Sequence, residues 1–246
     1  MEILVTGISG YIGSRLTPRL QRDGHSVRGF ARRPDRVALG VPVAAGDAVS
    51  GAGLKEALDG IDVAYYLIHS MEGAANGTFG AAERTAAENF AAAAQARGVG
   101  RVVYLGGPVP SEGRLSPHLA SRLEVERILL GASPCSVALR ASIVIGARSR
   151  SFRFLVRLVE RMPVVPIPAW GPNRTAPIDE RDIVALLAGA ATNEAICSQS
   201  LDAPGRDVVS YTDLIERIRD SLIVGRPTIG FRHFTVTPIA SRIASV

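Results

Sequence analysis

The amino-acid sequence predicts an α/β protein with a doubly wound parallel sheet and a small C-terminal lobe. Two observations carry this prediction. Short apolar runs alternate with longer helical patterns, and a glycine-rich turn follows the first apolar run. The runs are apolar nearly throughout, as expected of strands that helices cover on both faces. With 246 residues, the chain is long enough to bury a sizeable core.

The elements follow in a regular order. Six strands are expected in the runs EILVTG (2–7), SVRGFAR (26–32), VPVAAGD (41–47), DVAYYLIHS (62–70), RVVYLGG (101–107) and CSVALRAS (135–142). Helices are expected over residues 11–21, 54–58, 81–98 and 117–130. Pro18 is expected to kink the first helix, because proline removes a backbone donor and crowds the preceding turn.

The rhythm changes after Ala141. The sequence predicts an amphipathic helix over 151–162, an irregular proline-rich stretch over 163–173, and helices over 179–191 and 210–222. Such short elements usually pack over the carboxyl ends of the strands, where ligands bind. We therefore expect a core domain over residues 1–141, with 142–246 as an extension and substrate lobe packed on it.

The composition of the chain argues against several classes of protein and partner. The net charge of +5 comes from 27 arginines and Lys55, and the arginines are scattered while aromatic residues make up 5%. This distribution is not typical of a nucleic-acid binder. No run reaches the roughly 18 apolar residues of a membrane span. Cys135 and Cys197 lack metal-ligand spacing and suggest small core thiols in a reducing compartment, so the cytoplasm is the expected location.

The strongest motif is VTGISGYIG, which follows the first strand and opens the first helix. Gly7 would allow the tight turn, Gly10 the close approach of a pyrophosphate, and Gly13 close packing of helix on strand. The helix start would add backbone donors and a positive dipole. The sequence therefore predicts a dinucleotide cofactor bound over this loop, with further contacts from Ser9, Tyr11 and Ile12.

The end of the second strand indicates which dinucleotide binds. An NAD-selective site needs an acidic residue there for the ribose 2′-hydroxyl, whereas this chain reads FARRPDR. A guanidinium matches a 2′-phosphate, so Arg32 first and Arg33 second favour NADP(H). NAD(H) stays the alternative, with the two arginines as solvated surface charge.

Two further strand ends supply candidates. Asp47 would contact the adenine amino group or serve as a turn or capping residue. Leu67 and Ile68 would line the adenosine side of the cofactor cleft. His69 would lie nearer the nicotinamide, as a structural group or in proton transfer.

The segments VTGISGYIG, FARRPD, GD, AYYLIHSM, RVVYLGG, HLASR, LRASIVIG and RTAPI together resemble the NmrA-like branch of the atypical short-chain dehydrogenase/reductases. Within it, the chain is similar to bacterial epimerase-annotated proteins with HSM and HLxxR motifs. The resemblance implies a Rossmann-type fold with a small C-terminal substrate lobe. Members often continue into a further C-terminal domain, which we do not expect within these residues.

The resemblance also implies where catalytic groups would lie. The wider superfamily uses a Tyr, a Lys four residues later and a Ser on the preceding strand end. Here His118 falls at the Tyr position, Arg122 at the Lys position, and Gly106 and Gly107 where the Ser would be. His118 would then be a general acid and Arg122 would hold the ribose or a substrate anion, or both are ordinary helix residues.

Three function classes follow from these residues. The first is an NADP(H)-dependent oxidoreductase or epimerase-like enzyme acting on a small carbonyl or hydroxyl compound, with His118, Arg122 and His69 as catalytic candidates. The second is a non-catalytic NADP(H)-binding redox sensor that contacts a protein partner. The third is a membrane-associated accessory factor that uses the basic stripe of residues 150, 153, 157 and 161.

Overall fold

The computed structural model describes residues 1–68, 79–109 and 117–230, and the side chains of residues 79, 117 and 118 lie outside that description. Its contacts divide the chain into two units. The first comprises Met1–Ala141 and Arg181–Ala203, and the second Ser142–Glu180 and Pro204–Val246. The chain therefore leaves the first unit after Ala141 and returns to it at Arg181.

The first unit is built on a sheet in which, within the described residues, seven strands pair only in parallel. The strand order is β11-β6-β5-β4-β1-β2-β3. Since the chain builds from β1 toward β3 and then resumes on the other side of β1, the order reverses between β1 and β4. The predicted fold class is confirmed. The strands are β1 (Glu2–Thr6), β2 (Ser26–Ala31), β3 (Val43–Ala45), β4 (Val63–Tyr66), β5 (Arg101–Gly106), β6 (Val137–Arg140) and β11 (Gln199–Asp202).

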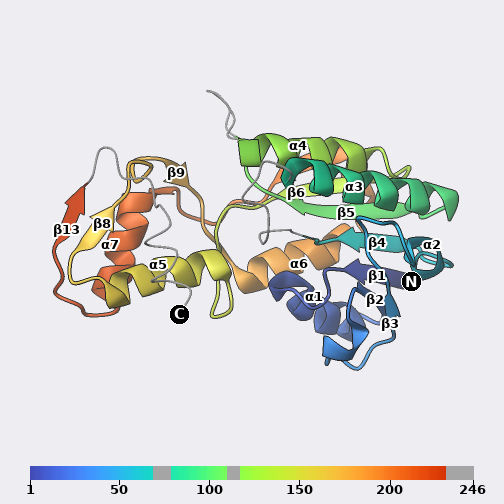
Figure 1. Ribbon diagram of the computed structural model, residues 1–246, viewed down its shortest axis with the longest axis horizontal. Helices are drawn as coiled ribbons and strands as arrows, with labels where there is room; N and C mark the ends of the chain where they lie inside the picture. The colour runs from blue at the N-terminus through green and yellow to red at the C-terminus, as the bar shows by residue number, and fades with distance from the viewer. Residues whose placement is uncertain (69–78, 110–116, 231–246) are drawn as a thin grey trace. The chain divides into compact units, whose positions relative to one another are not determined.

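Helices cover both faces of this sheet, with α3 and α4 on one face and α1 and α6 on the other (Figure 1). Two neighbouring residues of β4 show the alternation. The Tyr65 hydroxyl donates to the carbonyl of Leu187 in α6 at 2.8 Å, whereas the Tyr66 ring packs edge-on against Phe90 of α3. The helices of this unit are α1 (Tyr11–Arg22), α2 (Leu54–Ala57), α3 (Phe79–Ala96), α4 (Pro117–Leu130) and α6 (Glu180–Ala190), with short 3₁₀ turns η1 (Pro34–Arg36) and η2 (Glu194–Ile196).

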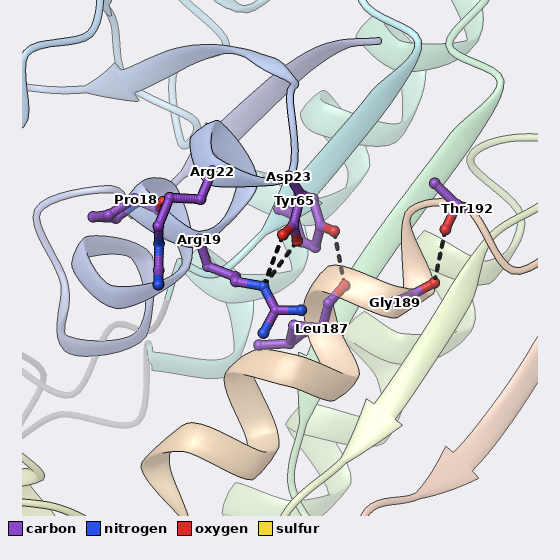
Figure 2. A network of polar contacts seen from close by, with 8 residues as sticks. All are labelled: Pro18, Arg19, Arg22, Asp23, Tyr65, Leu187, Gly189 and Thr192. Atoms are coloured by element: carbon purple, nitrogen blue, oxygen red, sulfur yellow. Dashed lines mark hydrogen bonds and ion pairs between the residues drawn. The ribbon is translucent and has the colours of Figure 1, made fainter.

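Side chains satisfy backbone groups near the end of α1 (Figure 2). Pro18 lies inside this helix, and its carbonyl accepts a hydrogen bond from Nε of Arg22 at 3.2 Å. Nε of the next residue, Arg19, donates to the carboxylate of Asp23, one turn further along, at 2.8 Å. The same view shows the Tyr65 hydroxyl reaching α6. α1 thus continues past Pro18 as one helix, with side-chain contacts near its end.

A second buried group, Arg101, holds the segment 181–203 against the rest of the first unit. Arg101, at the start of β5, is 8% exposed and donates from one guanidinium nitrogen to the carbonyls of Ala190 and Asn193, at 2.7 and 2.8 Å. These carbonyls lie at and just beyond the end of α6, where helix carbonyls lack intrahelical donors. The guanidinium therefore caps α6 and fixes the turn that leads to β11.

The second unit has its own small core of apolar residues from α5, α7 and the strand β8. Arg226 closes one end of it, because its guanidinium donates to the carbonyls of Val159, Glu160 and Met162, which lack helical donors at the end of α5. The elements are β7 (Val144–Ile145), α5 (Arg150–Arg161), β8 (Val165–Ile167), β9 (Arg174–Thr175), β10 (Ile178–Asp179), β12 (Val209–Ser210), α7 (Tyr211–Ser221) and β13 (Thr228–Gly230).

The proline-rich stretch 163–173 is not irregular throughout, so that prediction is wrong in part. Residues Val165–Ile167 form β8, which pairs in parallel with β13. Pro166 fits because β8 has β13 as its one strand partner among the described residues, so the missing N–H can face away from the ladder.

The prediction of two free core thiols is also wrong. Cys135 and Cys197 form a disulfide with a Cα–Cα distance of 4.5 Å, and both residues are half-buried. The sequence gives no sign of the pairing because β11 is polar and short, and only its place beside β6 brings the two cysteines together. No helix in the described ranges is long and apolar enough to span a membrane.

Candidate functional site

The site is built from the carboxyl ends of β1 and β4, where the strand order reverses and ligands bind in open α/β sheets. Thr6, fully buried at the end of β1, ties the two strands together. Its hydroxyl donates to the Tyr65 carbonyl at 2.9 Å and accepts from the Leu67 N–H at 3.2 Å. Thr6 therefore fixes the end of β1 from which the glycine loop begins. The glycine motif alone does not predict this role of Thr6.

The glycine loop requires its small residues. Gly7 has a φ of +65°, and a Cβ atom there would lie 2.5 Å from the backbone carbonyl oxygen of Leu67. Gly13 is buried, and a Cβ on it would collide with the carbonyl oxygen of Gly7. The Gly10 N–H donates to that same Gly7 carbonyl at 2.8 Å, which closes the turn. The loop is thus pinned against β4.

The start of α1 is open for an anion. Gly10 is the N-cap residue and provides no capping side chain, and both Ser9 and Gly10 are exposed. A helix start of this kind presents backbone donors and the positive end of the helix dipole. Tyr11 and Ile12 are half-buried in the first turn. An exposed, uncapped helix start that directly follows a tight glycine turn fits the pyrophosphate of a dinucleotide.

Two exposed arginines follow β2. Arg32 and Arg33 come directly after Ala31, which pairs with Ala45 of β3 at the carboxyl edge of the sheet. Neither guanidinium makes a hydrogen bond or ion pair to another residue in the described part of the chain; the backbone carbonyl of Arg33 accepts from Arg36. Both side chains can therefore bind an external anion without breaking an internal contact.

Asp47 follows β3 and shapes the next loop. One carboxylate oxygen accepts the Val49 N–H at 2.7 Å, so Asp47 forms a turn of its own, as one of the two sequence-based alternatives expects. The same carboxylate has a second oxygen for a donor such as an amino group. Asp47 therefore combines a local turn with an acceptor at the carboxyl edge.

Asn89 of α3 was missed by sequence reasoning. Its side-chain amide donates to the carbonyls of Ala48 and Val49, at 3.1 and 2.8 Å, and so holds the Asp47 loop against α3. An amide within an alanine-rich helix gives a weak signal in the sequence, because the loop that it contacts is about 40 residues away in the chain.

The end of β4 continues into Leu67 and Ile68. Leu67 is 7% exposed, and Ile68 is partly buried against the core of the α3 and α4 face. The Leu67 backbone is what requires glycine at position 7. His69 lies outside the described residues.

Helix α4 carries the other catalytic candidates. His118 lies in its first turn, and its side chain lies outside the described residues. Arg122, one turn later, is half-buried and donates to the Tyr104 hydroxyl at 3.5 Å. Burial raises the pKa of Tyr104, and the Arg122 charge opposes this shift. Tyr104 is therefore a neutral acceptor that orients the guanidinium.

The end of β5 offers no side-chain hydroxyl. Gly106 is its last residue and Gly107 follows, so the position of the serine in the wider superfamily has no side chain here. Nearby, the Ser121 hydroxyl of α4 donates to the buried Glu83 carboxylate at 2.8 Å and is thereby engaged in the core. In the described ranges, no cluster of three or more potential metal ligands occurs.

A parallel sheet with a glycine turn at its switch point defines this protein as a Rossmann-like α/β protein. Residues 7–120 match a family model described as NAD(P)H-binding. The match begins at the first glycine of the loop and extends into α4, so it includes the strand ends described above.

Curated relatives are reductases by name. A 2-alkyl-3-oxoalkanoate reductase of Stenotrophomonas maltophilia is 30% identical over 65% of this chain and 56% of its own length. A ceramide reductase of Caulobacter vibrioides is 25% identical over 87% of this chain and 68% of its own. The chain thus spans little more than half the length of the first relative.

Solved structures share the fold over nearly the whole chain. MoeE5 in complex with UDP-glucose and NAD has a TM-score of 0.77 at 23% identity, covering 100% of this chain and 92% of that one. A UDP-glucuronic acid 4-epimerase from Bacillus cereus, in complex with UDP-glucuronic acid and NAD, has a TM-score of 0.76 at 17% identity, covering 100% and 93%. At these identities the likeness establishes the fold alone.

Proposed function

We propose that this protein is an NADP(H)-binding member of the atypical short-chain dehydrogenase/reductases, in the NmrA-like branch, and acts as an oxidoreductase or epimerase-like enzyme on a small carbonyl or hydroxyl compound. The observation that carries the proposal is the glycine loop, where a Cβ on Gly7 or Gly13 would collide with backbone atoms, so that only glycine allows this tight turn before the uncapped start of α1. The family match over residues 7–120 supports it. A cytoplasmic location stays a prediction, and its basis in two free thiols does not hold because Cys135 and Cys197 form a disulfide.

NADP(H) is proposed over NAD(H) because of the charges after β2. The dinucleotide would lie with its pyrophosphate over Gly10 and Ser9 and its 2′-phosphate beside Arg32 and Arg33. A planar guanidinium binds a phosphate through two parallel hydrogen bonds, and no carboxylate stands at positions 31–33 for a 2′-hydroxyl. Asp47, held by Asn89, would accept from the adenine amino group.

The proposed chemistry is reduction of a keto group. When bound, the nicotinamide ring supplies or accepts hydride. His118 would donate the proton to the substrate oxygen as a carbonyl becomes a hydroxyl, and Arg122, oriented by Tyr104, would hold the ribose hydroxyls or a substrate anion. The name of the 2-alkyl-3-oxoalkanoate reductase favours an aliphatic keto compound as the substrate class.

A second candidate is a redox sensor that binds the cofactor without turnover and contacts a protein partner. The absence of a side chain at Gly106 and Gly107 favours it, because no hydroxyl from the end of β5 would orient a substrate. The accessory-factor alternative gains no support from α5. Its apolar residues Leu155 and Val159 are buried in the core of the second unit, so a membrane contact would have to use the basic face of the helix.

Calorimetry with NADPH and NADH tests the cofactor. NADPH should bind at least about tenfold more tightly, equivalent to 1.4 kcal/mol. Arg32→Ala should remove this preference, whereas Arg36→Ala, also exposed and in the same loop, should leave it unchanged. Absence of heat with either nucleotide, in protein with native circular dichroism, would refute both the enzyme and the sensor.

Turnover separates enzyme from sensor. Purified protein should oxidise NADPH with a panel of 3-oxo acids and aliphatic ketones, and His118→Ala should lower kcat by about 100-fold or more, the usual size of a general-acid contribution. His25→Ala, before β2, is the matched control and should retain activity. Tight NADPH binding with no turnover across the panel would instead identify the sensor.

A further inference from the structure

The disulfide between Cys135 and Cys197 extends the ladder of two neighbouring strands. Cys135 precedes β6 and Cys197 precedes β11. The two cysteines are 62 residues apart in the sequence. Each pair of facing residues in the two strands, from Val137 with Gln199 to Arg140 with Asp202, has the same separation. The bond therefore fixes the register of β11 on β6 at the amino end of both strands.

β11 depends on this attachment because it is an edge strand. Its one neighbour in the described sheet is β6, and its residues are half-buried or exposed. Within the strand, the Ser200 hydroxyl donates to the Glu126 carboxylate at 2.7 Å, and just beyond its other end the Ala203 N–H donates to the Arg140 carbonyl at 2.8 Å. The strand is thus held by the disulfide at one end and by polar contacts at the other.

The two sulfur atoms lie in different electrostatic surroundings. A guanidinium nitrogen of Arg101 is 3.6 Å from Sγ of Cys197. Arg101 is buried, and its contacts with Ala190 and Asn193 fix its position. In the described part of the chain, no cationic group makes such a contact with Cys135. A nearby guanidinium favours a thiolate over a thiol, so Cys197 is the better leaving group of the two.

A cavity lies beside the residues that precede Cys135. This open cavity of about 340 Å³ is lined in part by Ser133 and Pro134, which directly precede Cys135, and by Gln95 of α3. Its volume lies within the range of small-ligand sites. Cys135 and Cys197 are not among its lining residues, so the expected point of attack rests on the Arg101 contact with Cys197.

We propose that Cys135 and Cys197 form a reversible thiol–disulfide site that low-molecular-weight thiols open by attack on Cys135. The incoming thiolate forms a bond to Sγ of Cys135, the cystine bond breaks, and the electron pair stays on Sγ of Cys197 beside Arg101. A second thiolate attacks the reagent's sulfur in the mixed disulfide. This step releases the Cys135 thiolate and the reagent's own disulfide, so two thiols are oxidised and one cystine is reduced.

Non-reducing peptide mapping tests the bond and the point of attack. Trypsin should give residues 128–140 linked to residues 182–206, each with one cysteine. After a brief exposure to limiting glutathione and an acid quench, the adduct should lie on the peptide 128–140. Two separate free-thiol peptides after mild oxidation, or an adduct mainly on 182–206, would overturn the proposal.

Alkylation of single-cysteine variants tests the role of Arg101. In Cys135→Ser, the iodoacetamide reaction of Cys197 should reach half its maximal rate at a lower pH than that of Cys135 in Cys197→Ser. Arg101→Lys keeps a positive charge and should retain part of this difference, whereas Arg101→Gln should abolish it. Equal pH profiles for the two cysteines in the presence of Arg101 contradict the proposal.

Hydrogen exchange tests the consequence for β11. Reduction should speed exchange of the amides of Gln199–Asp202 by roughly tenfold or more, while the amides of β1 change little. The Cys135→Ser, Cys197→Ser double variant should exchange quickly in β11 with or without reductant. Slow exchange in β11 of the reduced protein shows that the bond does not control the strand and overturns the inference. None of these readouts requires a bound cofactor.

Discussion

The carbonyl oxygen of Leu67 lies 2.5 Å from the point that a Cβ atom on Gly7 would occupy. The glycine loop and the end of β4 are therefore in direct contact, and Thr6 holds the same strand end through its hydroxyl. The contact involves backbone, which has no alternative rotamer. Any side chain at position 7 has to displace the strand or the loop.

Gly7→Ala should abolish dinucleotide binding. The substitution adds a backbone collision to a φ of +65°, which alone costs about 1–2 kcal/mol for a non-glycine residue. We expect a loss of NADPH affinity of at least about 100-fold by calorimetry. Gly24→Ala is the matched control, because Gly24 also has a positive φ but no atom near its Cβ position. It should lower stability and leave affinity intact; wild-type affinity in Gly7→Ala would contradict the geometry.

Asn89→Ala should weaken binding through the adenine half of the cofactor. The variant loses two hydrogen bonds to the Asp47 loop, each worth about 1 kcal/mol. Affinities for NADPH and for 2′,5′-ADP should fall together by about tenfold, which is 1.4 kcal/mol. Gln95→Ala removes a comparable bond from the same helix to the Gly131 carbonyl and should leave both affinities unchanged. If the affinity for NADPH fell while that for 2′,5′-ADP did not, Asn89 would not act through the adenine half of the cofactor.

Glu126→Ala should be the most destabilising of these changes. Glu126 is 3% exposed and binds Arg140 through both carboxylate oxygens, at 2.6 and 3.0 Å, and it also accepts from Ser200. Removing one partner of a buried ion pair typically costs about 3–5 kcal/mol. Urea unfolding followed by circular dichroism should show this loss. Glu124 lies on the same helix as Glu126 and forms an exposed ion pair with Arg84 of α3. Glu124→Ala should therefore change the free energy of unfolding by less than about 1 kcal/mol.

The parallel core could be predicted from the sequence because its strands are apolar nearly throughout and alternate with helices. β11 could not, since the segment QSLD is short and polar and becomes a strand only through its pairing with β6. The disulfide depends on that pairing and was missed with it. The glycine loop is local and was visible in the sequence. Asn89 and Thr6 act on distant backbone groups, so their roles required the assembled fold.

The second unit offers a pH-dependent helix start. Ser210 and Asp213 form a capping box at α7, in which each side chain accepts the other's backbone N–H. Hydrogen bonds from the hydroxyl and backbone of Ser210 hold the pKa of Asp213 below its ordinary value of 3.8. Because the folded pKa is lower, Asp213 stabilises the fold above pH 4 and loses this contribution as pH falls through the folded pKa.

Fluorescence of Trp170, the one tryptophan of the sequence, tests the capping box because its ring packs edge-on against Tyr211 in the second unit. Ser210→Ala should lower the free energy of unfolding of this unit by about 1 kcal/mol at pH 7. Asp213→Asn should also be destabilising at pH 7, and its difference from the wild type should diminish on acidification toward pH 3. A difference that grows as pH falls would reverse the sign derived from the pKa.

Ile223→Gly should stabilise the second unit. Ile223 follows α7 with a φ of +56°, and its side chain is 91% exposed, so it is held in the left-handed region with little burial to offset the cost. That conformation costs roughly 1–2 kcal/mol for an L-residue, more than the approximately 0.5–1 kcal/mol of extra chain entropy that glycine loses on folding. The expected gain is several tenths of a kcal/mol to about 1 kcal/mol in urea unfolding followed by Trp170 fluorescence. Leu222→Gly is the matched control, because Leu222 has a φ of −83° and gains no relief. It should destabilise the same unit, and equal effects of the two glycines would show that backbone strain does not act at position 223.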